Sequence, residues 1–252
     1  MKKKAFCASL LFLVFLIINS LSNVAALGYN SGVKQNQNFV WKCNVCNELE
    51  MNTIFGSLWD DFGYFKNLSK GKKMKWEVTN IEINETFISI IINTWDWRKE
   101  ENWGIIDNTS QIVYYTNPDD YRSNELNFSD YSSLVPFWFP TPIGEYLGGL
   151  NSKLIKWYDV DNRVLPTLNV EIAKDEITFN LPTKDIYIIA IYNDQGILDS
   201  YKLYTKGNVV IIDISLDFLP LYVIPSLVSL AIIPTIGIVI YIYKKRRTLV
   251  QP

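Results

Sequence analysis

Histidine is absent from the 252 residues of this sequence. Its absence excludes Ser-His-Asp and Cys-His catalytic groups and removes the commonest general base. What remains for an enzyme is carboxylate chemistry, which needs two acids several ångströms apart across a cleft. We therefore predict a protein that is not an enzyme. A carboxylate-dependent glycan hydrolase is kept as an alternative, with Asp96 between Trp95 and Trp97 as its starting point.

Cysteine is scarce, and two of the three cysteines, Cys43 and Cys46, form a Cys-X-X-Cys motif. Zinc needs four ligands, and the chain offers neither histidine nor a second cysteine pair. The pair Asp159 and Asp161 lacks the following Gly and closing Glu of a calcium loop. We therefore predict no metal site and no cofactor. For Cys43 and Cys46 we predict a structural disulfide, with a redox or metal role as the alternative.

Long uncharged apolar runs occur at the two ends of the chain. Three lysines precede the apolar run Ala5–Ile18, as in a secretory signal peptide, so we predict a signal peptide over 1–26. No charge occurs over Phe218–Tyr243, and four basic residues follow at once. This pattern predicts a transmembrane helix over 218–243 and a basic cytoplasmic tail over 244–252. We expect a single-pass protein of the cell membrane with its N-terminal domain outside the cell.

The part between these ends is acidic, because it holds 17 of the 24 basic residues and all 26 acidic residues, a net charge of about −9. Such a surface repels nucleic acid and anionic lipid headgroups, so neither is predicted as a partner. Four Asn-X-Ser/Thr sequons are candidate glycosylation sites in an exported chain. Their asparagines are Asn67, Asn84, Asn108 and Asn127.

The same part is predicted as a flexible leader with the Cys-X-X-Cys motif, 27–48, followed by a single β-rich domain, 49–217. Apolar spacing predicts a helix over Leu49–Phe65. Runs of β-branched and aromatic residues predict a hairpin turning at Asn84 and Glu85, a short strand over 110–117, and a hairpin turning at Lys174 and Asp175. A meander follows, with strands over 186–192, 197–204 and 208–214. We predict a mainly β (α+β) fold: a curved antiparallel sheet with one or two packed helices, plus the C-terminal transmembrane helix.

The stretch Val135–Gly149, VPFWFPTPIGEYLGG, joins the strand regions. Thr141 is a suitable helix N-cap and Pro142 a suitable first helical residue. An apolar stripe then continues to Trp157, which predicts one amphipathic helix packed on the concave face of the sheet. The aromatic side chains that precede the helix are either core or the rim of an apolar cavity.

The meander order Y-x-x-x-G-x-L-x-x-Y-x-x-Y-x-x-G, from Tyr192 to Gly207, resembles strands of the LolA and LprG class of exported lipid-handling proteins. That resemblance implies a curved sheet that wraps helices and encloses acyl chains. The whole layout also looks like the uncharacterised archaeal surface proteins with a signal peptide, a β-rich domain and a C-terminal anchor. The second resemblance implies location and build, and no activity.

These observations predict a membrane-tethered extracellular binding module for a lipid or another apolar ligand. Its site would be lined by Phe137, Trp138, Phe139, Tyr146 and Trp157. The alternative is a cell-surface or envelope protein whose exposed aromatic residues Trp95, Trp97 and Trp103 contact another protein. A lipid site predicts a large cavity inside the sheet, whereas the alternative predicts a filled core and an exposed apolar patch.

Overall fold

The computed structural model describes residues 28–99, 102–123, 126–128, 133–173, 184–205 and 207–217. The chain divides into two compact units, Met1–Ser215 and Leu216–Pro252, and the fold below is that of the first. The predicted signal peptide, transmembrane helix and cytoplasmic tail lie outside the described residues. Within the described ranges, no helix is both long and apolar enough to span a bilayer.

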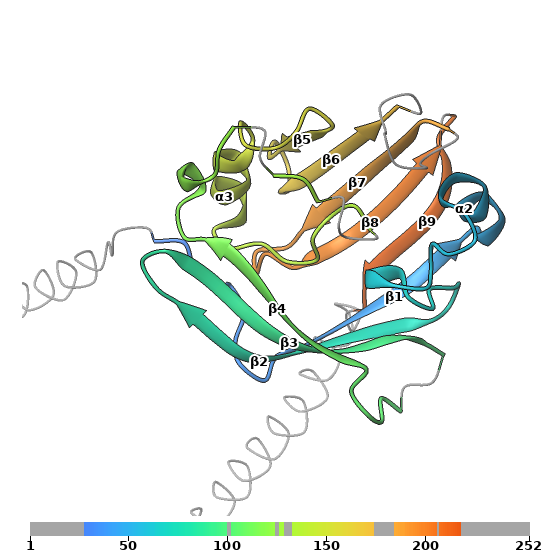
Figure 1. Ribbon diagram of the computed structural model, residues 1–252, viewed down its shortest axis with the longest axis horizontal. Coiled ribbons are helices and arrows are strands. Elements are labelled where there is room, and N and C mark those ends of the chain that lie inside the picture. Colours follow the sequence, from blue (N-terminus) through green and yellow to red (C-terminus); the bar gives the residue numbers. More distant parts are fainter. Residues whose placement is uncertain are drawn as a thin grey trace, which may run out of the picture. The chain divides into compact units, whose positions relative to one another are not determined.

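The mainly β prediction is confirmed, because nine strands form one antiparallel sheet in the order β4-β3-β2-β1-β9-β8-β7-β6-β5 (Figure 1). Among the described residues, two α-helices and two 3₁₀ turns accompany the sheet. The elements are β1 (Asn38–Cys46), α2 (Glu48–Phe55), η1 (Gly63–Phe65), β2 (Lys73–Ile83), β3 (Phe87–Arg98), β4 (Asn108–Tyr115), η2 (Pro118–Asp120), α3 (Ile143–Leu150), β5 (Tyr158–Asp161), β6 (Thr167–Ile172), β7 (Ile186–Tyr192), β8 (Leu198–Thr205) and β9 (Val209–Leu216).

The sheet consists of two meanders that meet at its middle. The first meander, β1 to β4, runs outward to one edge, and the second, β5 to β9, returns from the other edge. They join where the Asn47 N–H donates to the Ile211 carbonyl and the Asn44 side chain donates to Ser215 Oγ. The prediction of a flexible leader over 27–48 is wrong for Asn38–Cys46, which form the central strand β1. The β-rich domain therefore begins before residue 49, its predicted first residue.

The connection between β4 and β5 crosses the sheet and shows how strongly the sheet is curved. Phe139, in this connection, has its ring centroid 5.3 Å from Tyr114 on β4 and 5.2 Å from Tyr192 on β7. These two strands are six positions apart, about 29 Å in a flat sheet with spacings of about 4.8 Å. The ring centroids of Tyr114 and Tyr192 are instead at most about 10.5 Å apart, because each lies just over 5 Å from the ring centroid of Phe139. The sheet thus bends around the crossing segment, as the curved-sheet prediction requires.

Backbone pairing holds the crossing segment in place. The Phe139 N–H donates to the Gly196 carbonyl and the Leu198 N–H donates to the Phe137 carbonyl, both at 2.9 Å. Gly196 has φ +75°, and a Cβ there would lie 2.0 Å from the Phe139 carbonyl oxygen. Glycine is therefore required at this turn by its backbone conformation and by the close approach of the crossing segment.

The predicted helices are shorter than the apolar spacing suggested. The helix after Thr141 ends at Leu150, so the part of the prediction that extends to Trp157 is wrong. Thr141 is not the N-cap either, because Pro142 occupies that position and the Thr141 hydroxyl donates to Asn30 Oδ1 instead. The helix predicted over Leu49–Phe65 is only partly formed. Helix α2 ends at Phe55, where Gly56 has φ +84°, and a single 3₁₀ turn follows at Gly63–Phe65.

The strand predictions fare better. The hairpin β2–β3 turns at Asn84, whose side-chain oxygen accepts hydrogen bonds from the N–H groups of Thr86 and Phe87. Strand β4 and the meander β7–β8–β9 match their predictions within two residues at each end. The hairpin predicted around Lys174 is confirmed for its first strand, β6, and the rest lies outside the described residues.

Candidate functional site

The first meander carries a polar hollow, here called the Asp96 pocket. Part of its wall is a row of paired residues across three strands: Trp76 on β2 pairs with Thr94 on β3, and Thr94 pairs with Asn108 on β4. Because they are directly paired, these side chains share one face of the sheet. The Thr94 hydroxyl donates to the Asn108 carbonyl at 3.2 Å, which ties β3 to β4 at this row.

The pocket opens where the side chains on the inward face of β3 and β4 change from apolar to polar. Side chains alternate between the two faces of a strand. On β3 the inward positions are the fully buried Ile88, Ile90 and Ile92, and then Thr94 and Asp96. On β4 the stripe changes in the same region, from Tyr114 and Ile112 to Ser110 and Asn108. The apolar core ends at that line and a hydrogen-bonding surface begins.

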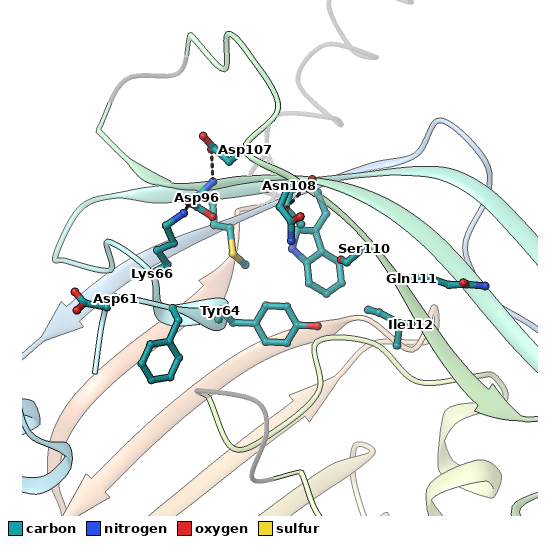
Figure 2. A pocket seen from close by; sticks show the side chains of 14 residues that line it. Asp61, Tyr64, Lys66, Asp96, Asp107, Asn108, Ser110, Gln111 and Ile112 are labelled. Atoms are coloured by element: carbon teal, nitrogen blue, oxygen red, sulfur yellow. Dashed lines mark hydrogen bonds and ion pairs between the residues drawn. The ribbon is translucent and has the colours of Figure 1, made fainter. Parts of the chain in front are cut away.

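The segment between α2 and β2 covers this surface. Figure 2 shows Tyr64 extending from this segment toward Ile112, while Lys66 points at Asp96. The Tyr64 ring centroid lies 5.5 Å from Trp76 and 4.8 Å from Phe137, so Tyr64 joins the pocket wall to the core. Phe62 also lines the pocket and is 63% exposed. The resulting pocket has a volume of about 600 Å³.

Two carboxylates, Asp96 and Asp107, lie at the charged end of the pocket. The Asp96 N–H donates to Asp107 Oδ2 at 2.8 Å, which links the two residues through the backbone. Lys66 Nζ is 2.9 Å from Asp96 Oδ2, and Arg98 pairs with Asp107. The hydrogen bond and charge of Asp96 raise the pKa of the Lys66 ammonium. Each of these two carboxylates thus has a cationic partner.

One donor in the pocket wall has no partner. Trp76 is fully buried, and its indole Nε1–H meets no acceptor among the described residues. The neighbouring Trp41, whose ring centroid is 5.0 Å away, donates its Nε1–H to the Leu198 carbonyl at 2.7 Å. A buried donor without a partner costs about 1–3 kcal/mol.

A second hollow of about 410 Å³ adjoins the first and shares Asp96 and Asp107 with it. It is lined by the other end of β3 and by Asn67, one of the sequon asparagines. The two carboxylates therefore stand between two open spaces. Among the described residues, no three Cys, Asp or Glu side chains are grouped as a metal ion would require.

The aromatic residues predicted to line an apolar site are packed against one another. Phe137, Trp138, Phe139 and Tyr146 are all fully buried. The ring centroids of Phe137 and Trp41 are 5.1 Å apart, and Trp138 donates its Nε1–H to the Ser31 carbonyl at 2.8 Å. The two pockets described above are lined by other residues. In this structure the aromatic residues form the core that holds the crossing segment, which was the alternative interpretation of that stretch.

The fifth predicted residue, Trp157, lies apart from these four. It follows α3 directly before β5 and is half-buried. Its Nε1–H is buried and, like that of Trp76, meets no acceptor within the described part of the chain. The predicted grouping of five aromatic residues around one cavity is therefore replaced by four core residues and one residue before the edge strand.

The remaining predicted residues also have definite places. Trp95 and Trp97, expected to be exposed, are buried, so that part of the surface-contact prediction is wrong, while Trp103 is half-buried. Cys43 and Cys46 are free thiols in the structure, and the predicted disulfide is not formed there. The four sequon asparagines Asn67, Asn84, Asn108 and Asn127 are exposed, and their glycosylation stays a prediction.

The sequence singled out Asp96 as an acid but did not predict that Tyr64, Lys66, Trp76 and Asp107 belong to one site with it. The signal was present in the strands, where Thr94 and Asp96 continue an inward stripe of isoleucines with polar residues. No family model, curated protein or solved structure matches the chain. The archaeal and LolA/LprG resemblances accordingly stay predictions from the sequence.

Proposed function

We propose that the protein is a membrane-tethered extracellular binding module whose ligand occupies the Asp96 pocket. The ligand class that suits the pocket is a polar, hydroxyl-rich molecule of saccharide type. The extracellular position and the tether are supported by the sequence patterns of residues 1–26 and 218–252.

The chemistry of the pocket wall supports this ligand class. A hydroxyl group both donates and accepts hydrogen bonds, so it can serve the acceptor-only carboxylates and the donor-only indole N–H in one site. Tyr64 and Phe62 add ring surface to the same wall. An acyl chain offers no polar group, and burying the pair Lys66–Asp96 beneath it would remove water from both charges without replacing it. The volume of about 600 Å³ lies in the usual range of small-ligand sites.

The observation that carries the proposal is the unpaired Nε1–H of the fully buried Trp76 in the pocket wall. Buried polar groups in folded proteins nearly always have a partner. A ligand oxygen at this position would satisfy the indole, and Asp96 and Asp107 would accept from neighbouring hydroxyl groups.

The test is saturation-transfer NMR on the full-length protein in detergent micelles, with a panel of neutral mono- and disaccharides and with palmitate. We expect saturation transfer to at least one saccharide. Trp76→Phe should weaken that binding about tenfold, the equivalent of one lost hydrogen bond of about 1.4 kcal/mol. Trp157→Phe is the matched control, because it also removes an unpaired buried indole N–H but lies outside the pocket, and it should leave binding unchanged.

Other outcomes would replace the proposal. Binding of palmitate without binding of any saccharide would support the prediction of a lipid-binding module. No binding in the panel would favour the surface-contact interpretation. Hydrolysis of a glycoside that stops in Asp96→Asn would identify the hydrolase instead.

A further inference from the structure

The two thiols of the Cys-X-X-Cys motif differ in accessibility. Cys43 is fully buried on β1, with its N–H donating to the Lys72 carbonyl and its carbonyl accepting from the Gly71 N–H. Cys46 is half-buried at the end of β1. Residues three apart in a regular strand point to opposite faces. The alternation of burial nevertheless ends after Cys43. The Cys43 thiol donates to the Val45 carbonyl at 3.3 Å and interacts with the Cys46 thiol, so that the two groups titrate together.

The surroundings favour ionisation of one thiol over the other. Cys46 directly precedes Asn47, which caps α2 by accepting from the Glu50 N–H, so Cys46 lies beside a helix N-terminus. The hydrogen bond from Cys43 lowers the pKa of Cys46, against burial and the charges of Glu48 and Asp60, and Lys72 assists. That same hydrogen bond and burial raise the pKa of Cys43. The accessible thiol is thus also the more acidic one, the combination that makes a cysteine reactive.

We propose that Cys43 and Cys46 form a thiol–disulfide exchange site, with Cys46 as the attacking thiol and Cys43 as the resolving thiol. The co-reactant is an external disulfide. The Cys46 thiolate attacks one sulfur of that disulfide, forms a mixed disulfide and releases the first thiolate. The Cys43 thiol then gives its proton to solvent and attacks Cys46 Sγ, which releases the second thiolate. The chain is oxidised to the Cys43–Cys46 disulfide, and the external disulfide is reduced by two electrons to two thiols.

This site is independent of the proposed binding function, because Cys43 and Cys46 do not line either pocket. It also differs from the structural disulfide predicted from the sequence. A structural disulfide resists reduction, whereas an exchange site cycles between both states with its outer cysteine open to attack.

The first experiment needs no variant. The full-length protein is reduced in detergent micelles, freed of reductant, pulsed with less than one equivalent of N-ethylmaleimide, and mapped by peptide mass spectrometry. We expect Cys46 to be modified about tenfold or more faster than Cys43. Equal modification, or faster modification of Cys43, would overturn the assignment. Failure of dithiothreitol to reduce the pair in the folded protein would identify a structural disulfide and would overturn the proposal as well.

The second experiment separates the two roles. The reduced proteins are treated with hydroxyethyl disulfide, a neutral probe that Glu48 and Asp60 do not repel. The wild type should form the internal disulfide, and Cys43→Ser should stop at a mixed disulfide on Cys46. Cys46→Ser should react about tenfold more slowly than either. A stable mixed disulfide on Cys43 in Cys46→Ser, formed as fast as the one on Cys46, would contradict the division of roles.

Discussion

The two meanders of the sheet follow the same plan, yet their inward faces end differently. On β7 the inward residues Ile186, Ile188, Ala190 and Tyr192 are all buried, so the apolar stripe continues to the end of the strand. On β3 the stripe becomes polar at Thr94. The crossing segment packs on the first kind of surface, and the Asp96 pocket lies over the second. The inward stripe that stops being apolar before its strand ends therefore marks the place where the apolar core gives way to the Asp96 pocket.

The largest expected effect tests the seam between the crossing segment and the second meander. Gly196→Ala places a Cβ 2.0 Å from the Phe139 carbonyl oxygen at φ +75°, so the seam must open. We expect a loss of about 4 kcal/mol or more in the free energy of unfolding, measured by urea denaturation with tryptophan fluorescence. Gly207→Ala is the control, because φ is +95° there but nothing lies within 4 Å. It should cost about 1–2 kcal/mol. Equal losses would mean that the backbone contact at Gly196 contributes nothing.

The next effect compares the core and the pocket wall within the first meander. Trp41→Phe removes the donor to the Leu198 carbonyl. Trp76→Phe removes a donor that has no partner in the described residues. Both replacements delete the same atoms, so the difference between them reports the hydrogen bond. We expect Trp41→Phe to cost about 1–3 kcal/mol more than Trp76→Phe in the same urea measurement. A larger loss for Trp76→Phe would show that its N–H is satisfied within the fold.

A smaller effect concerns one ion pair in each meander. Lys66–Asp96 lines the pocket, and Lys202–Asp213, with 3.8 Å between Nζ and Oδ2, lies on the second meander. The lysine side chains are 47% and 42% exposed, so Lys66→Gln and Lys202→Gln should each cost less than about 1 kcal/mol in stability. Saccharide binding, followed by the same NMR measurement, should weaken only in Lys66→Gln. Weakening in both variants would place the effect outside the pocket.

The smallest effect is a local titration on the second meander. Hydrogen bonds from the Arg163 guanidinium and backbone N–H hold the pKa of Asp161 at about 2. The stabilisation from this pair is present above the ordinary carboxyl pKa, near 3.8, and is lost as the pH falls toward 2. In Arg163→Gln, NMR titration of the carboxyl carbon should give Asp161 a higher pKa, nearer its ordinary value. An unchanged titration would remove Arg163 as the cause.

Much of the fold could be predicted because its signals are local. β-Branched and aromatic runs identified the hairpin β2–β3 and the meander β7–β8–β9, and Asn84 and Gly196 marked their turns. Helix lengths were predicted less well. The apolar spacing after Thr141 continued past Leu150, but the chain leaves the helix there to reach the edge strand β5.

The site could be predicted only in part because its members come from separate elements. Asp96 was recognised as an acid beside aromatic residues, but Lys66 and Asp107 become its neighbours through the covering segment and the pairing of β3 with β4. The aromatic residues Phe137, Trp138 and Phe139 were predicted either as core or as the rim of an apolar cavity, and the structure buries them.

The sequence by itself determined where strands form and which side chains alternate along them, because propensity and periodicity act over a few residues. It also contained the change from isoleucine to threonine and aspartate on β3. The tertiary structure decided that β1 pairs with β9, that the sheet bends around Phe139, and that Trp76, Thr94 and Asn108 share one face of the sheet. These features depend on strand register and on contacts between residues far apart in the chain, whose free energies appear only when the whole sheet is assembled.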